Sequence, residues 1–284
     1  MSMPAVRRFN APYDWAAIAD ETLDQGAAIV TGLLCEEDVA EINGSLQRYL
    51  ASVRGAGESA SGSPAYDAFL GDRTFRLHGL LEKAPAVASV MAHPDILEWV
   101  RTLIAPRTRQ VQMNAAEYIQ IQPGEKIQQA HRDSDSWPLA IGDRPLIVNA
   151  IYALDDFSEA NGATWIAPGS FRWPPSQRAE KAQYTRAVMK RGDAILFRGD
   201  LIHRGGANET DVPRRGLSIS YCAGYLRPVE NSFLNLSVAT VKQLSPELQA
   251  TLGYAAYDGS VEGSGLLGLF ENGDPARVLE GQQG

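Results

Sequence analysis

The spacing of apolar residues separates a helical first third of the chain from a strand-rich middle. Apolar residues recur at helical intervals over 11–25 and 36–53, which predicts two amphipathic helices there. A short apolar strand is predicted between them, at 27–30, and a further helix over 94–103. These elements make up a helical N-terminal part that extends to about residue 108.

From residue 110 the pattern changes to short strands separated by turn residues. Strands are predicted over 111–122, 146–154, 194–197 and 217–221, and the first is followed by the turn pair Pro123-Gly124. Many short strands with no regular strand–helix alternation are typical of a sandwich or barrel. We therefore predict a mainly β core over about 109–225. In the C-terminal extension, 226–284, Ser245 and Pro246 mark a helix start.

Small residues dominate 54–64, where glycines at 55, 57 and 62 stand among serines and two alanines. Glycine permits large changes of backbone conformation, and these serines offer no apolar anchor. The segment is therefore either an inert linker or a mobile lid over a binding site.

Composition narrows the classes of protein that need to be considered. The 284 residues, 44% of them hydrophobic, can bury a substantial core, and we expect one domain over 1–284. A net charge of −8 argues against a nucleic-acid partner. No apolar stretch is long enough to span a membrane. The two cysteines, Cys35 and Cys222, have no CxxC partner, so we expect a cytoplasmic protein; a homodimer is left open.

Three of the chemically active residues have the spacing of a metal site. His131 and Asp133 form an H-x-D motif at the predicted end of a strand, where residues two apart face the same side. His203 follows a distant apolar strand. Two histidines and one carboxylate are the facial ligand set of non-haem Fe(II), which leaves positions open for further ligands. The H-x-D motif alone is a weak signal, and the second histidine strengthens it.

A pair of arginines follows the distal histidine, at the start of the next predicted strand. On a strand, only one of Arg214 and Arg215 can point into the barrel. An arginine there can bind the far carboxylate of a dicarboxylic co-substrate with two charge-assisted hydrogen bonds.

The order and spacing of several short motifs are similar to those of a known family. From about Gln25 to the C-terminus the chain resembles the phytanoyl-CoA dioxygenase family. Within it, the likeness is greatest to the small oxygenases that tailor natural products such as fungal meroterpenoids and indole alkaloids. The matching segments are QGAAIVTGL from 25, QQAHRD from 128, LDDF from 154, NGAT from 161, PGS from 168, and GYLRPVEN from 224.

This resemblance implies a double-stranded β-helix (a cupin-like jelly roll) with flanking helices, Fe(II) as the metal, and 2-oxoglutarate and O₂ as co-substrates. It also implies that His131, Asp133 and His203 bind iron and that Arg214 binds 2-oxoglutarate. The positions that hold the co-substrate in this branch match Gln128, Thr164 and Arg76. Phe171 and Ser134 depart from the usual histidine and aspartate of the family, but neither is at a ligand position.

The expected activity is oxidation of a small, largely apolar molecule by hydroxylation, desaturation, epoxidation or rearrangement, in secondary metabolism. Asp133 disfavours a halogenase, since related halogenases lack this carboxylate. Two alternatives stay open: a cupin-type metal dioxygenase or isomerase that uses no 2-oxoglutarate, and a catalytically silent jelly-roll binding subunit. We expect the substrate pocket to be lined by the 54–64 segment, the C-terminal segment, Tyr66, Phe75, Met113 and Trp137.

Overall fold

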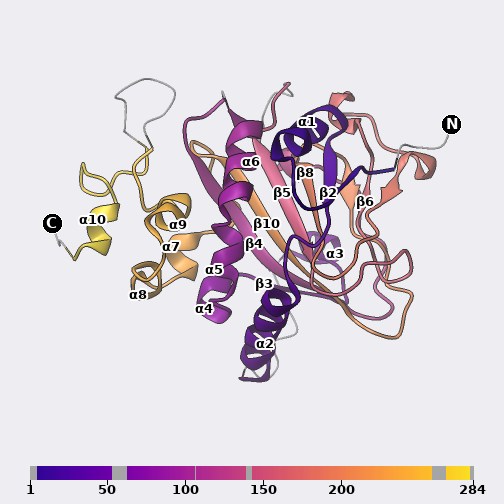
Figure 1. Cartoon of the computed structure of the whole chain (residues 1–284), viewed down its shortest axis with the longest axis horizontal. Coiled ribbons are helices and arrows are strands. Elements are labelled where there is room, and N and C mark those ends of the chain that lie inside the picture. Colours follow the sequence, from indigo (N-terminus) through magenta and orange to yellow (C-terminus); the bar gives the residue numbers. More distant parts are fainter. Residues whose placement is uncertain (1–4, 53–62, 106, 139–142, 258–266, 282–284) are drawn as a thin grey trace.

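A computed structural model describes residues 5–52, 63–105, 107–138, 143–257 and 267–281. It contains a large and a small β-sheet (Figure 1). The large sheet has the order β1-β2-β8-β5-β10-β4-β3, formed by Arg8–Phe9, Ala27–Val30, Ala194–Arg198, Ile147–Ala153, Arg214–Ala223, Val111–Ile121 and Thr74–Leu77. The small sheet has the order β7-β6-β9, formed by Thr185–Arg186, Trp165–Ile166 and His203–Arg204.

His131 adds a fourth segment to the small sheet, because it forms an antiparallel bridge with His203. All strand pairs are antiparallel except β1 with β2. This pair of sheets is the predicted double-stranded β-helix, and the prediction of the fold class is confirmed.

Helices from both ends of the chain flank the large sheet (Figure 1). Those of the first third are α1 to α6, at Trp15–Gln25, Glu36–Ser52, Pro64–Leu70, Leu80–Lys83, Val87–Met91 and Pro94–Ile104. Those of the C-terminal part are α7 to α10, at Ser232–Asn235, Val238–Val241, Pro246–Thr251 and Ala276–Leu279. Three 3₁₀ turns, η1 to η3, lie at Asp133–Ser136, Ser170–Arg172 and Lys181–Gln183.

The ends of the predicted helices depend on capping residues. Helix α1 begins at Trp15 rather than at 11, because the Asp14 side chain accepts a hydrogen bond from the Ala17 amide and caps the first turn. Ser245 caps α9 in the same way, at the predicted position, by accepting from the Leu248 amide.

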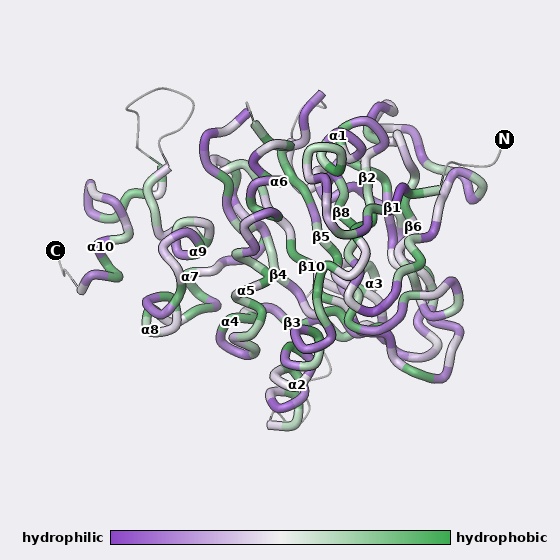
Figure 2. Tube along the Cα trace, viewed as in Figure 1, coloured by the Kyte–Doolittle hydropathy of each residue, from purple (hydrophilic) through white to green (hydrophobic). Residues whose placement is uncertain are grey.

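The central strands are apolar on both faces because each face packs against a different layer. In β2 and β8, Ala28, Val30, Ala194 and Leu196 belong to the core between the large sheet and the helices. The alternate residues of the same strands belong to a second core between the two sheets, namely Ala27, Ile29, Ile195 and Phe197. Two-sided burial explains why these strands have continuous apolar sequences. In Figure 2 the central strands are largely hydrophobic, whereas α2 mixes both kinds of residue.

Strand β10 is longer than the predicted 217–221, because polar residues on one of its faces interrupt the apolar pattern. Leu217, Ile219 and Tyr221 point into the core beneath the helices. On the opposite face, Arg214, Gly216, Ser218 and Ser220 line a cavity. One face of β10 therefore packs in the core, and the other face lines the cavity.

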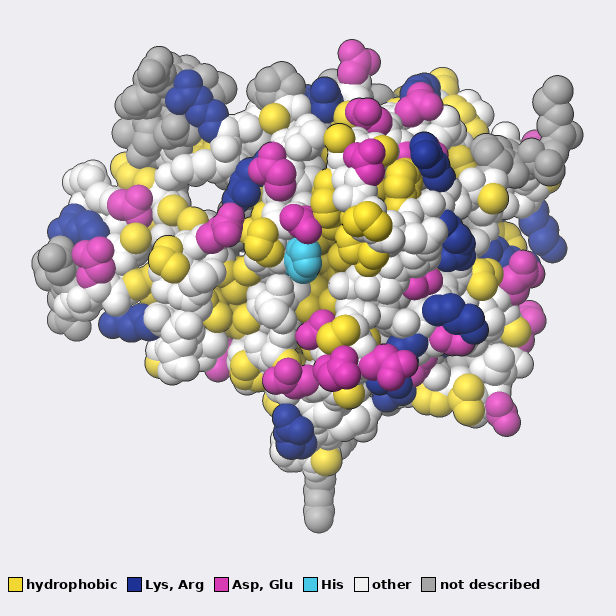
Figure 3. All heavy atoms as spheres, in the orientation of Figure 1, with side chains coloured by type: hydrophobic (Ala, Val, Ile, Leu, Met, Phe, Trp, Pro, Cys, Tyr) yellow, Lys and Arg dark blue, Asp and Glu magenta, His cyan; other side chains and the backbone are white. Residues whose placement is uncertain are grey.

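Most of the 54–64 segment, which was expected to be a lid or a linker, lies outside the described residues. No helix in the described ranges is long and apolar enough to cross a membrane. On the face seen in Figure 3, acidic and basic side chains are interspersed.

Tyr221 offers a test of how the helices are joined to the sheet. Its hydroxyl is fully buried and donates to the Met91 carbonyl of α5 at 2.8 Å. Tyr221→Phe leaves this carbonyl without its donor and should lower the free energy of unfolding by about 1–2 kcal/mol in urea denaturation. Tyr225→Phe is the matched control, since Tyr225 is 39% exposed, and it should change stability by much less. Equal effects of the two changes would contradict this view.

Candidate active site

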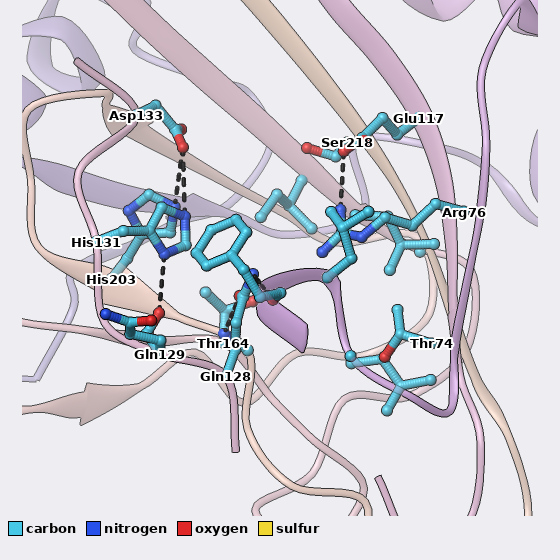
Figure 4. A pocket seen from close by; sticks show the side chains of 18 of the residues that line it. Thr74, Arg76, Glu117, Gln128, Gln129, His131, Asp133, Thr164, His203 and Ser218 are labelled. Carbon is cyan, nitrogen blue, oxygen red and sulfur yellow. Dashed lines mark hydrogen bonds and ion pairs between the residues drawn. The ribbon is translucent and has the colours of Figure 1, made fainter. Parts of the chain in front are cut away.

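The three predicted metal ligands come from two neighbouring segments and a 3₁₀ turn. His131 and His203 exchange two main-chain hydrogen bonds of 3.0 Å, which place the imidazole rings side by side with centroids 4.3 Å apart. Asp133 is the first residue of η1. The expectation that Asp133 would lie on the strand with His131 is therefore wrong. The tight turn, rather than strand alternation, brings its carboxylate back toward the histidines (Figure 4).

Hydrogen bonds to the main chain orient both imidazoles. The Nδ1 atoms of His131 and His203 each lie 3.0 Å from a carbonyl oxygen, that of Gln129 and that of Leu201. Both Nε2 atoms consequently face Asp133, whose Oδ1 is 3.4 Å from the first and 3.7 Å from the second. Within the described residues, His131, Asp133 and His203 are the one group of three or more His, Cys, Asp or Glu side chains that could hold a metal ion. Their ligand atoms all lie within 4.8 Å of one another.

Burial and charge put Asp133 and His203 in the protonation states that metal binding requires. Burial alone would raise the pKa of Asp133, but His203, His131 and the hydrogen bond from Asn149 outweigh it and hold this pKa far below its usual range. Burial lowers the pKa of His203 to about 4, so its ring is neutral at pH 7. For His131, burial also disfavours the cation, yet the neighbouring carboxylate raises the pKa overall. An ionised carboxylate beside neutral imidazole is a donor set that suits Fe(II).

Asn149 is a site residue that the sequence analysis missed. It lies on β5, is 2% exposed, and donates from Nδ2 to Oδ2 of Asp133 at 2.7 Å. Residues 146–154 were interpreted as a plain core strand. The signal was present, because Asn149 is the one side chain in that run that ends in an amide.

Arg214 carries a buried charge that lacks a carboxylate partner among the described residues. Its guanidinium packs on the Phe157 ring at 3.9 Å and donates to the Gly162 carbonyl, while Nε has no partner. Burial, reinforced by the nearby Arg76, lowers the pKa of Arg214 to about 9. Arg215 points the other way and pairs with Asp155. A buried cation aimed into a cavity fits an anionic ligand.

The other expected co-substrate residues also line this cavity. Thr164 is 4% exposed, and its hydroxyl has no hydrogen-bond partner among the described residues. Gln128 is engaged by the main chain, because Oε1 accepts from the Gly205 amide and Nε2 donates to the Phe69 carbonyl. Arg76 pairs with Glu117 at 3.0 Å (Figure 4).

A cavity of about 560 Å³ joins the metal ligands to Arg214. Helix α3 covers part of it, with Tyr66 and Phe69 in the lining, and the Phe69 ring meets the His131 ring edge-on at 4.8 Å. Tyr66 was expected there. Phe75, Met113 and Trp137 were also expected in the lining but are not part of it; they belong to or pack against the core beneath the helices.

Glu117 adds a charged wall to the cavity that the sequence analysis did not anticipate. Its carboxylate pairs with Arg76 and with Nε2 of His78, each at 3.0 Å. His78 also faces Glu230, which accepts the main-chain N–H groups of Gly79 and Ala116. Through His78, the carboxylate of Glu230, in the segment after β10, is linked to Glu117 in the cavity wall.

His78 makes stability depend on pH. Burial opposes its protonation, but the hydrogen bond to Glu117 and the negative charges of Glu117 and Glu230 raise its pKa to about 9. The stabilisation is thus complete below the unfolded-state pKa of about 6.5 and is lost as pH rises through 9. The side chain is 40% exposed, so screening should keep the effect under about 1 kcal/mol. Urea denaturation should show the wild type losing its advantage over His78→Gln between these pH values. A constant difference across that range would contradict the assignment.

The sequence is similar to a known family and to known proteins. A profile of the phytanoyl-CoA dioxygenase family matches residues 23–216. The dioxygenase FUM3 of Gibberella moniliformis is 31% identical over 240 residues, which cover 81% of this chain and 79% of that protein. The dioxygenase olcK of Penicillium canescens is 30% identical over 240 residues, which cover 82% and 78%.

Solved structures share the fold at lower identity. The non-heme alpha ketoglutarate dependent epimerase SnoN from nogalamycin biosynthesis has a TM-score of 0.60 at 21% identity, covering 74% of this chain and 81% of its own. HygX from Streptomyces hygroscopicus, solved with nickel, 2-oxoglutarate and hygromycin B bound, has a TM-score of 0.57 at 15% identity, covering 75% and 89%.

Proposed function

We propose a function from the premise that the chain belongs to the phytanoyl-CoA dioxygenase family. The chain is an iron(II)- and 2-oxoglutarate-dependent oxygenase of secondary metabolism. In our proposal His131, Asp133 and His203 hold the iron, and Arg214 holds the co-substrate. The observation that carries it is one continuous cavity with this ligand group at one position and a buried arginine at another.

The donor set supports iron as the metal. Two imidazole nitrogens and one carboxylate oxygen converge from one side, which leaves the opposite side for a bidentate oxo-acid and O₂. Bound iron(II) supplies oxidative chemistry, in which the decarboxylation of 2-oxoglutarate to succinate accompanies oxidation of a C–H bond of the substrate.

The residues of the chain bind and orient the co-substrate. Arg214 offers a charged donor whose Nε is unsatisfied, and the Thr164 hydroxyl faces the same cavity. A dicarboxylate that reaches from the metal ligands to Arg214 would satisfy both groups. This need for an anion argues against a metal enzyme that uses no 2-oxoglutarate.

The remaining cavity volume supports a small molecule as the substrate. Tyr66 and Phe69 of α3 cover the cavity and can exclude water from the reacting groups. The sheet side carries Glu117, Ser218 and Ser220, so the substrate needs polar groups as well as an apolar body. We keep hydroxylation, desaturation, epoxidation and rearrangement as alternative outcomes. Free thiols at Cys35 and Cys222 are compatible with work in the cytoplasm.

His203→Ala tests the metal site. The variant should lose stoichiometric Fe(II) binding in an anaerobic titration, because one of three ligands is removed, while its circular dichroism spectrum stays that of the folded protein. His93→Ala is the control, since His93 lies outside the ligand group, and it should bind iron as the wild type does. Full iron occupancy in His203→Ala would overturn the assignment.

Arg214→Ala tests the co-substrate site. Removal of a buried charged contact should weaken 2-oxoglutarate binding by roughly 2–5 kcal/mol, seen as a higher concentration needed to produce the metal-to-ligand absorption band. Arg215→Ala is the matched control, because Arg215 pairs with Asp155 and does not line the cavity. If Arg215→Ala weakened 2-oxoglutarate binding and Arg214→Ala did not, the assignment of Arg214 as the co-substrate residue would be wrong.

A further inference from the structure

The two oxygens of Asp133 have different surroundings. Oδ1 faces both histidine Nε2 atoms, at 3.4 and 3.7 Å. Oδ2 accepts the amide of Asn149 at 2.7 Å. Figure 4 shows the carboxylate directed at the two rings. One oxygen is therefore directed at the metal position and the other is engaged by the protein.

Asn149 is held firmly in place. It lies on β5 between β8 and β10, with Phe197 and Ser220 as its paired residues in those strands. Only 2% of it is exposed. Main-chain bonds on both sides of the strand leave its backbone little freedom, so its amide offers Asp133 a fixed donor.

A carboxylate can bind a metal ion through one oxygen or through both. In a six-coordinate site, three single-atom protein ligands leave three positions, two for the oxo-acid and one for O₂. If both oxygens of Asp133 bound the metal, one of these positions would be lost. The state of Oδ2 thus decides how much room the co-substrate has.

We propose that Asn149 is a positioning residue that restricts Asp133 to ligation through Oδ1 and so keeps a position open for 2-oxoglutarate. The inference rests on the proposed function. A residue that merely supported the ligand would lower metal affinity on removal, by about 10- to 100-fold. Asn149 instead governs the affinity for the co-substrate, at an almost unchanged affinity for iron.

The experiment compares Asn149→Leu with the wild type. Leucine has a similar volume but no donor. Anaerobic Fe(II) titration should give affinities that agree within about threefold, because the carboxylate remains a ligand. Titration of the iron-loaded protein with 2-oxoglutarate, followed by the absorption band, should show at least a tenfold loss of affinity.

A second measurement reads the carboxylate itself, without turnover. Infrared difference spectra with ¹³C-labelled aspartate separate the symmetric and antisymmetric carboxylate stretches, and binding through both oxygens brings the two frequencies closer together. The separation should narrow in iron-loaded Asn149→Leu. Asn43→Leu is the control, since it makes the same change on α2, at a residue that donates to the Leu154 carbonyl and does not line the cavity. It should leave both measurements unchanged.

The possible failures can be told apart. If Asn149→Leu binds 2-oxoglutarate within threefold of the wild type, or loses iron and co-substrate affinity in parallel with unchanged stretches, the inference is wrong. If the wild type itself binds no iron or shows no band, the proposed function fails instead. If Asn149→Leu does not fold, Asn149→Ala is measured in its place, because it removes the same donor and leaves only a small cavity. The results named for Asn149→Leu then confirm or contradict the inference in the same way.

Discussion

Two main-chain hydrogen bonds between His131 and His203 hold together the segments that carry the proposed metal ligands. They continue a ladder in which Gln128 donates to Gly205, and Gly124 and Glu125 bond to Asn208. Residues 124–131 therefore run beside 203–208 although most of them belong to no regular strand. The imidazole positions follow from this backbone pairing, and the backbone carbonyls then set the rotation of each ring. The ligand geometry is thus built into the main chain rather than into side-chain packing.

The cavity beside this ladder contains charges that the protein itself only partly balances. Asp133 is surrounded by two histidines and an amide, and Glu117 has Arg76 and His78. Among the residues that the structure describes, Arg214 has a carbonyl and an aromatic ring as partners but no paired carboxylate. Burial of such groups is costly, so the arrangement favours ligands that complete it over ligands that do not. In the proposed function, the unbalanced charge of Arg214 selects a dicarboxylate, and the shape of the remaining cavity selects the substrate.

The sequence predicted the elements that have a clear apolar pattern, and missed those that depend on distant partners. The strand Ala27–Val30 was predicted with its observed bounds, because both of its faces are apolar. Strands β6, β7 and β9 have two residues each, too few for any periodicity. Asp133 turned out to lie in a 3₁₀ turn, which a strand pattern cannot indicate. Phe75, Met113 and Trp137 were placed in the pocket because an aromatic or large apolar residue looks alike in a core and in a cavity lining.

The alternation along β10 has a consequence for how such an enzyme can change. Leu217, Ile219 and Tyr221 support the helices, whereas Ser218 and Ser220 face the cavity from the same strand. The proposed metal ligands lie on other segments, at His131, Asp133 and His203. Evolution, or a directed library, can therefore alter position 218 to accept new molecules, whereas a change at 220 would also remove the acceptor of the buried Asn114 amide. Opposite faces of β10 therefore carry core residues that the fold requires and a cavity residue that can vary with the substrate.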